Sequence, residues 1–336
     1  MLAVSCNKPF DLSLTERPMP ERHDGEVLIR VRRVGMCGTD FHIYSGNQPY
    51  LSYPRVMGHE LAGEVWEADP DSGLQTGAVV TINPYFRCKK CHACQLGKPN
   101  CCMNIRVMGV HIDGGMAEFV AVPAEAVIDV EGLSFEQAAM VEFLAIGLHA
   151  VRRGSITSAD RVLVVGAGAI GMGVALFARM AGARVHVIDT NDGRLQRAQA
   201  VCPDIETALV ADGIEAWIGE RTEGNLFDAV FDASGSAAAI EKGFSYVAHG
   251  GRYVLVSVVS QDITFSDPEF HKREMQLIGS RNAMKHDFQM VIDMIRDGAI
   301  PTEKLHTHSL SAAEMPERVP QLMAARGELL KAIITI

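Results

Sequence analysis

The sequence lacks the features that would place the protein in a membrane or on nucleic acid. No segment approaches the roughly 20 apolar residues of a membrane span, and the most apolar stretch, 172–188, is interrupted by Arg179 and Arg184. There is no basic run, and 31 Lys and Arg residues against 41 Asp and Glu residues leave a net charge of −10. We therefore expect neither membrane insertion nor nucleic-acid binding.

The first residues of the chain also lack the basic start and the continuous apolar core of a secretory signal peptide. Without such a signal, the eight cysteines indicate a reducing compartment, where they are thiols or metal ligands. We therefore expect a cytoplasmic protein. With 336 residues, 48% of them hydrophobic and 21% charged, the chain is expected to be globular and to form two domains.

The first part of the chain has the pattern of an irregular β domain. Short alternating apolar segments occur at 25–35, 61–68, 77–83 and 116–122, and glycine, proline and aspartate separate them. Around 134–153 the apolar residues change to helical spacing, with Ser134 as a candidate N-cap.

From residue 161 the pattern changes to alternating strands and helices. Strands are predicted at 161–166, 183–189, 227–235, 252–258 and 275–280, and a helix is predicted at 169–182. Such alternation predicts a parallel, doubly wound sheet, so the fold class is α/β. The segments 287–298, 314–327 and 331–336 follow this sheet, and we expect them to rejoin the first domain.

Four cysteines occur in one short run with the spacing C-x2-C-x2-C-x7-C: Cys88, Cys91, Cys94 and Cys102. Four thiolates on closely spaced turns can enclose one tetrahedral zinc ion and leave no position open for a substrate. The run therefore predicts a structural zinc site. Cys102 is the fourth ligand by spacing, and the neighbouring Cys101 is the alternative. Three cysteines are left over as ordinary buried thiols: Cys6, Cys101 and Cys202.

A glycine-rich loop directly follows the strand at 161–166 and opens a helix. It has the pattern G-x-G-x-x-G, formed by Gly166, Ala167, Gly168, Ala169, Ile170 and Gly171. The glycines allow a tight turn, close approach of the backbone to a pyrophosphate, and close packing of the helix on the strand. With an acidic residue at the end of the next strand, the pattern predicts dinucleotide binding.

That acidic residue is Asp189, which also bears on the choice of cofactor. A carboxylate at this position accepts a hydrogen bond from the ribose 2′-OH and repels a 2′-phosphate, so NAD is favoured over NADP. Arg194 lies nearby in the sequence and is the reason to keep NADP as an alternative.

Cys37, in the segment CGTDFH, and His59-Glu60, in the segment PRVMGHE, complete an ordered pattern with the two motifs above. Over nearly its whole length the chain resembles the zinc-containing medium-chain dehydrogenases, in the polyol and sugar-acid branch with the sorbitol and L-threonine dehydrogenases. The segments 37–42, 54–60, 88–102, 109–120, 166–171 and 280–283 most closely resemble L-idonate, L-gulonate and L-galactonate 5-dehydrogenase-type enzymes.

The resemblance implies a GroES-like β domain formed by 1–149 and 283–336, and a Rossmann domain at 150–282. It implies that Cys37, His59 and Glu142 ligate a catalytic zinc, with Glu60 ligating directly or through movement of the metal. It further implies that the hydroxyl of Thr39 and the imidazole of His42 carry the substrate proton outward. In the Ser-Arg-Asn segment, Arg281 and Asn282 would contact the substrate.

The chain departs from the usual family pattern at three places. Phe143 follows Glu142 where proline is usual, and Ala78 stands where a structural aspartate is usual. Residues 67–76 do not form the usual glycine-rich turn. None of these departures removes a group that takes part in the reaction.

These observations predict an NAD- and zinc-dependent dehydrogenase acting on a secondary hydroxyl of a sugar acid or polyol. Arg281 would bind a substrate carboxylate, or would form a salt bridge at the surface or between domains. Tyr44, Tyr50 and Trp66 could line the pocket or serve as ordinary packing. The alternatives are an L-threonine or other secondary-alcohol dehydrogenase and, from a different class, a non-catalytic sensor that binds NAD and zinc. The resemblance suggests a homodimer or homotetramer.

Overall fold

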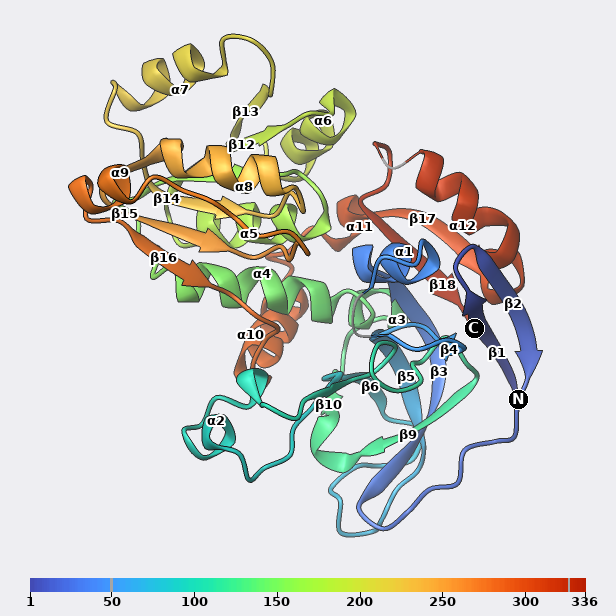
Figure 1. Cartoon of the computed structure of the whole chain (residues 1–336). Coiled ribbons are helices and arrows are strands. Elements are labelled where there is room, and N and C mark those ends of the chain that lie inside the picture. Colours follow the sequence, from blue (N-terminus) through green and yellow to red (C-terminus); the bar gives the residue numbers. More distant parts are fainter. Residues whose placement is uncertain (49–50, 326) are drawn as a thin grey trace. The chain divides into compact units, whose positions relative to one another are not determined.

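The computed structural model describes residues 1–48, 51–325 and 327–336. The chain forms two compact units, the first from Met1–Phe143 with Ala283–Ile336 and the second from Leu144–Asn282 (Figure 1). The division falls inside helix α4 (Val141–Arg153). In the part of the chain that is described, no helix has the length and apolar character needed to cross a membrane.

The first unit is built mainly from β-strands. Its largest sheet has the strand order β10-β6-β5-β3-β18-β17, and β9 also pairs with β3. A second sheet has the order β2-β1-β4, and β7 pairs with β8. The bounds are β1 Leu2–Lys8, β2 Asp11–Glu16, β3 Glu26–Met36, β4 Arg55–Val56, β5 Glu60–Glu67, β6 Val79–Ile82, β7 Tyr85–Phe86, β8 Arg106–Val107, β9 Phe119–Pro123, β10 Val127–Asp129, β17 His306–Ser311 and β18 Lys331–Thr335.

Short helices connect these strands. They are α1 Gly38–Tyr44, α2 His92–Gln95, α3 Phe135–Ala138, α10 Lys285–Arg296, α11 Thr302–Leu305 and α12 Met315–Ala324, with 3₁₀ turns η1 Pro99–Cys101, η2 Ala124–Ala126 and η4 Ala312–Glu314. The four predicted strands of this region correspond to β3, β5, β6 and β9. The hairpin of β1 and β2 was not predicted, although Val4 and Leu12 at its inner face are buried in the core.

The segment predicted as a helix over 134–153 is broken into two. Ser134 caps α3 as expected, because its side chain accepts a hydrogen bond from the Gln137 N–H at 3.2 Å and the Gln137 side-chain oxygen accepts one from the Ser134 N–H at 3.0 Å. Helix α3 ends after a single turn, and α4 begins at Val141. Periodicity alone does not reveal this break, since Ala138, Ala139 and Met140 are all buried as a continuous helix would also require.

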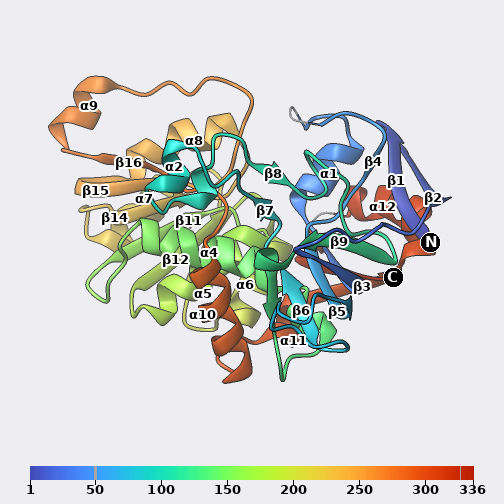
Figure 2. The same ribbon diagram turned by 90° about the horizontal axis from the view of Figure 1, so that it is seen from below.

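The second unit has the predicted parallel sheet, with the strand order β13-β12-β11-β14-β15-β16. Its elements are β11 Arg161–Val165, α5 Ala169–Met180, β12 Arg184–Asp189, α6 Asp192–Val201, β13 Glu206–Leu209, α7 Ile214–Thr222, β14 Phe227–Asp232, α8 Ala237–Gly243, η3 Phe244–Tyr246, β15 Val247–Leu255, α9 Asp267–Lys272 and β16 Gln276–Gly279. The chain runs outward from β11 in one direction and then from β14 in the other. Right-handed crossovers therefore place α5 and α8 on opposite faces of the sheet (Figures 1 and 2). This arrangement confirms the predicted α/β class.

The C-terminal residues 283–336 belong to the first unit. Strand β18 pairs antiparallel with β3, with Ala332 opposite Met36 and Ile333 opposite Gly35. Strand β18 therefore lies inside the sheet that also carries β5, between β3 and β17, and it brings Lys331 next to residues from the first third of the sequence.

The sheet of the second unit should depend strongly on Phe231, which is fully buried in β14. Replacing it with alanine leaves a cavity, so Phe231→Ala should lower the free energy of unfolding by about 3–5 kcal/mol. Val258, which is 80% exposed, is a control in the same unit, and Val258→Ala should change it by less than about 0.5 kcal/mol. Urea denaturation measures both variants, and equal midpoints would contradict the packing described here.

Candidate metal centres and dinucleotide loop

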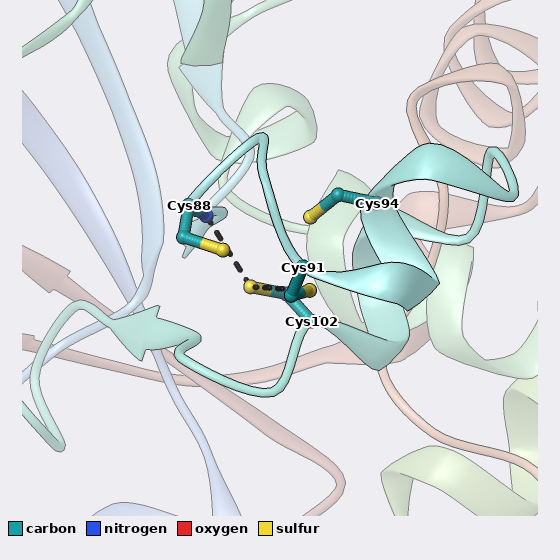
Figure 3. A group of neighbouring side chains, drawn as sticks. All are labelled: Cys88, Cys91, Cys94 and Cys102. Carbon is teal, nitrogen blue, oxygen red and sulfur yellow. Dashed lines mark hydrogen bonds between the residues drawn. The ribbon is translucent and has the colours of Figure 1, made fainter.

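The four predicted cysteines converge on one point. Cys88, Cys91, Cys94 and Cys102 have sulfur atoms that all lie within 4.8 Å of one another, and the four side chains point toward a common centre (Figure 3). The Cys91 and Cys102 sulfurs are 3.8 Å apart. Zinc–sulfur bonds of about 2.3 Å in a tetrahedron place the sulfurs about 3.8 Å apart, so the cluster has the size of a closed zinc site.

Local structure holds each of these cysteines. Cys91 caps α2, Cys94 lies on that helix, and Cys102 follows the 3₁₀ turn η1. Backbone N–H groups of Cys88 and Met103 lie 3.3 and 3.5 Å from the sulfurs of Cys102 and Cys91. Hydrogen bonds from backbone N–H groups and from Asn104 lower the pKa of Cys88 to about 6, whereas burial and the neighbouring thiols raise the pKa of Cys94 to about 12. A metal ion would favour the thiolate form of all four.

The leftover cysteines differ from expectation at one position. Cys6 and Cys202 are buried, but Cys101 is exposed, so the expectation of a buried thiol was wrong there. Cys101 ends the 3₁₀ turn, and the buried Cys102 is the member of this pair that joins the cluster.

A second group consists of Cys37, His59 and Glu60, whose ligand atoms also lie within 4.8 Å of one another. Cys37 follows β3 and caps α1, and Glu60 begins β5, directly opposite Gly35 of β3. A Cβ at Gly35 would overlap a carboxylate oxygen of Glu60, so this glycine makes room for the group. Segments 22 residues apart in sequence thus meet because β3 and β5 are neighbours.

Asp40 ties these two segments together. Its carboxylate accepts hydrogen bonds from the Cys37 N–H at 2.8 Å and from the Gly58 N–H at 3.3 Å. The residue is fully buried, and burial raises the pKa of its carboxyl. Sequence reasoning assigned Asp40 no role, although it lies within the CGTDFH segment.

Glu60 is engaged by a buried lysine that the sequence analysis missed. The Lys331 ammonium lies 2.7 and 2.6 Å from the two carboxylate oxygens of Glu60 and 3.3 Å from the Met36 carbonyl oxygen. It also lies 4.2 Å from the centre of the Phe143 ring, a cation–π contact. Phe143, which stands where the family usually has proline, therefore supports the ammonium. A lysine opening the apolar segment KAIITI was the available signal for Lys331.

Glu142 lies in the first turn of α4 and is 1% exposed. Its Oε1 accepts a hydrogen bond from the Tyr85 hydroxyl, and within the described residues its Oε2 has no hydrogen-bond partner. Burial raises the pKa of Glu142 to about 7, although the nearby His59 opposes this shift. Glu142 lies outside the group formed by Cys37, His59 and Glu60. Its negative charge is nevertheless close enough to raise the pKa of His59.

The composition of this buried region suits a divalent cation. Burial alone would lower the pKa of His59, but the negative charges of Cys37, Asp40 and Glu142 outweigh burial and raise it well above its usual value. His59 Nδ1 and Glu142 Oε2 are buried polar atoms without a partner in the described part of the chain. Sulfur, imidazole nitrogen and carboxylate oxygen are the donors that zinc prefers. The residues therefore fit a zinc ion.

The other candidate site residues lie at distinct places. Thr39 is half-buried and His42 is exposed, three residues apart on α1. Arg281 is exposed and Asn282 is half-buried with a positive φ of 54°, and both belong to the second unit. Among the aromatic residues considered for the pocket, Tyr44 belongs to the buried core and Trp66 is 46% exposed. Tyr50 lies outside the described residues.

The glycine-rich loop joins β11 to α5 in the second unit. Gly166 has φ of 102°, Gly168 caps α5, and a Cβ at Gly171 would overlap the carbonyl oxygen of Gly166. Ala169 and Ile170 form the first turn of α5, whose backbone N–H groups make this end of the helix suited to a phosphate.

Asp189 ends β12 beside this loop. Its Oδ2 accepts a hydrogen bond from the Ala167 N–H at 2.7 Å, and its Oδ1 accepts one from the Asn191 N–H at 2.8 Å. The carboxylate therefore braces the loop, and each oxygen keeps a second lone pair. A guanidinium nitrogen of Arg194 lies 3.7 Å away.

Comparisons with known proteins agree with this geometry. Residues 23–132 match the family description "Alcohol dehydrogenase GroES-like domain", and residues 169–297 match "Zinc-binding dehydrogenase". The chain is 39% identical to L-galactonate-5-dehydrogenase of Escherichia coli K12 over 339 aligned residues, covering 100% of this chain and 99% of the relative. It is 30% identical to L-threonine 3-dehydrogenase of Pyrococcus horikoshii, covering 97% and 96% of the two chains.

The crystal structure of the alcohol dehydrogenase rspB of Escherichia coli CFT073, complexed with NADH, matches with a TM-score of 0.92 at 29% identity. The match covers 100% of this chain and 99% of that chain. With the two family descriptions matching more than half of the sequence, these likenesses confirm the resemblance. The chain belongs to the zinc-binding alcohol dehydrogenase family and is an oxidoreductase.

Proposed function

We propose that this dehydrogenase uses zinc and NAD to oxidise a secondary hydroxyl of a sugar acid or polyol to a ketone. The observation that carries the proposal is the group formed by the half-buried Cys37 and the buried His59 and Glu60, with the buried Glu142 nearby, in a chain 39% identical to an L-galactonate-5-dehydrogenase. A cytoplasmic location and a homodimeric or homotetrameric assembly are part of the proposal, as the family resemblance implies.

Cys37, His59 and Glu142 would hold the catalytic zinc, and the cysteine cluster would hold a structural zinc. When bound, zinc acts as a Lewis acid that lowers the pKa of a hydroxyl oxygen. Both carboxylate oxygens of Glu60 contact the Lys331 ammonium, so the positive charge of Lys331 would already balance the negative charge of Glu60. Zinc would face one thiolate and one carboxylate, so the ion and its three protein ligands together would be close to neutral.

Thr39 and His42 would take up the proton that leaves the substrate hydroxyl. They are three residues apart on α1 and so lie on one side of the helix. The half-buried hydroxyl of Thr39 would pass the proton to the imidazole of His42, which is exposed and can release it to water. Arg281 would bind the carboxylate of a sugar acid through its planar guanidinium, and Asn282 would bind a substrate hydroxyl.

Gly166–Gly171 would bind the pyrophosphate of NAD at the start of α5. Asp189 would accept a hydrogen bond from the ribose 2′-OH through the lone pairs that the loop leaves free. Arg194, beside Asp189, is the residue that could instead attract a 2′-phosphate.

A substrate panel tests the reaction. L-Galactonate, L-gulonate, L-idonate, sorbitol and L-threonine are compared by kcat/KM, with NADH formation followed by absorbance. At least one sugar acid should exceed sorbitol by about 10-fold, the factor that one added ionic contact of about 1.4 kcal/mol supplies. It should also exceed L-threonine, which carries a carboxylate but lacks the further hydroxyl groups of a sugar acid. Preference for L-threonine would favour the second candidate, which the 30% identical relative supports. Zinc-loaded protein that binds NAD yet oxidises none of the panel would indicate a sensor.

Metal analysis separates the two zinc sites. The unaltered protein should contain about two zinc ions per chain, and Cys37→Ala and Cys94→Ala should each contain about one. Cys37→Ala should still bind NAD while kcat/KM falls by at least about 1,000-fold, a loss of about 4 kcal/mol in transition-state stabilisation. Retention of two zinc ions or of activity by Cys37→Ala would refute its role as a ligand.

Asp189→Asn tests the choice of cofactor. The substitution keeps one oxygen for the loop N–H groups but removes the charge that would repel a 2′-phosphate. The ratio of kcat/KM for NAD to that for NADP should fall by about 10-fold or more, as expected for loss of a charged hydrogen bond. Asp192→Asn, three residues along on α6, is the control, and equal ratios in the two variants would mean that another residue reads the ribose.

A further inference from the structure

The two buried glutamates of the first unit are bound in different ways. Both carboxylate oxygens of Glu60 accept hydrogen bonds from Lys331. Glu142 instead has one oxygen occupied, because Oε1 accepts a hydrogen bond from the Tyr85 hydroxyl, while Oε2 has no partner within the described residues. Glu142 is therefore the glutamate with a free oxygen.

Tyr85 is held firmly enough to direct this hydrogen bond. It begins β7, pairs with Val107 of β8, and its N–H donates to the Asn83 side-chain oxygen at 3.1 Å. Its ring packs edge-to-face on Phe288 of α10, with ring centres 6.4 Å apart, and Phe288 is fully buried. Tyr85 itself is 9% exposed, so water does not compete freely for the hydroxyl. Backbone pairing and ring packing thus fix the position of the hydroxyl before any metal binds.

A hydrogen bond to one oxygen of a carboxylate has two effects on how it binds a metal. It draws electron density from that oxygen, which makes it a poorer ligand, and it fixes the plane of the carboxylate so that the other oxygen keeps one direction. A glutamate without such a partner can bind through one oxygen or both and can turn between these modes.

We infer that Tyr85 is a positioning residue that makes Glu142 bind the catalytic metal through Oε2 alone. This inference rests on the proposed function, since it takes Glu142 as a ligand. Single-oxygen binding leaves a coordination position for the substrate hydroxyl that a two-oxygen mode would fill. Tyr85 therefore serves the reaction without touching the substrate, and neither the cysteine spacing nor the His-Glu pair indicates this.

Tyr85→Phe tests the inference because it removes only the hydroxyl and keeps the ring contact with Phe288. Tyr253→Phe is the matched control, since Tyr253 is a fully buried tyrosine of the second unit whose hydroxyl donates to the Ile240 carbonyl oxygen at 2.9 Å. Thermal melting of both variants verifies that they fold. The first readout is the rate at which a chelator removes zinc, and the second is the visible spectrum after cobalt replaces the catalytic zinc.

Tyr85→Phe should lose one of its two zinc ions about 10- to 100-fold faster than the unaltered protein, the range typical of losing a partner of a metal ligand. Its cobalt spectrum should shift as the coordination number changes. Tyr253→Phe should match the unaltered protein in both readouts. If Tyr85→Phe also matches it, the inference is overturned while the proposed function stands. An unaltered protein that binds fewer than two zinc ions overturns both.

A double-mutant cycle distinguishes an effect of Tyr85 on Glu142 from a general effect of the substitution on the structure. Glu142→Gln and Tyr85→Phe are measured singly and together for the rate of zinc loss. Because Tyr85 acts only through Glu142, the double variant should lose zinc no faster than Glu142→Gln alone. Multiplicative effects of the two substitutions would show that Tyr85 acts elsewhere.

Discussion

The first unit depends on a single ion pair that is almost completely removed from solvent. Lys331 and Glu60 are 1% and 0% exposed, and the ammonium contacts both carboxylate oxygens. Removing one partner of such a pair typically costs about 3–5 kcal/mol, because the other charge is left buried and unpaired. The two residues lie on β18 and β5, on either side of β3, so the pair ties the end of the chain to the strand that begins the candidate metal site.

This ion pair explains why several neighbouring residues are of unusual type. Gly35 lies on β3 between the two charged residues, and any larger side chain there would overlap the Glu60 carboxylate. Phe143 offers the face of its ring to the ammonium at 4.2 Å. Lys331 already neutralises Glu60, so the charged groups left among the proposed ligands are Cys37 and Glu142, with the buried Asp40 close by. If Cys37, His59 and Glu142 are the ligands as proposed, a zinc ion would meet two negative ligands and not three, which would preserve more of its Lewis acidity.

The sequence was sufficient for features encoded by local spacing. The cysteine run, the glycine-rich loop and the parallel strands each depend on residues that are close together in the sequence. Rules based on residue spacing describe such local features well. The spacing selected Cys102, and the structure groups this residue with Cys88, Cys91 and Cys94. The hairpin of β1 and β2 and the break between α3 and α4 were missed, since packing decides both.

The candidate catalytic site was predicted only in part, for a physical reason. Its residues lie on or directly beside β3, β5, α4, β7 and β18, so that each of them looks ordinary in its own segment. From the sequence alone, Tyr85 is one residue of a short strand, and Lys331 is a polar residue at the start of an apolar strand. Their roles arise when the sheet brings them to buried carboxylates, where an unpaired charge or hydroxyl would be costly.

The two candidate metal centres therefore relate to the fold in opposite ways. Four cysteines on one short loop can gather around zinc with little help from the rest of the chain, which suits a site that only has to remain closed. The candidate catalytic group requires strands that are far apart in the sequence of the first unit. Its residues Cys37, Glu60 and Glu142 form hydrogen bonds with Asp40, Lys331 and Tyr85 respectively. Loss of packing in the main sheet would thus disturb the candidate catalytic group before the cysteine cluster, because only the candidate catalytic group takes its geometry from distant strands.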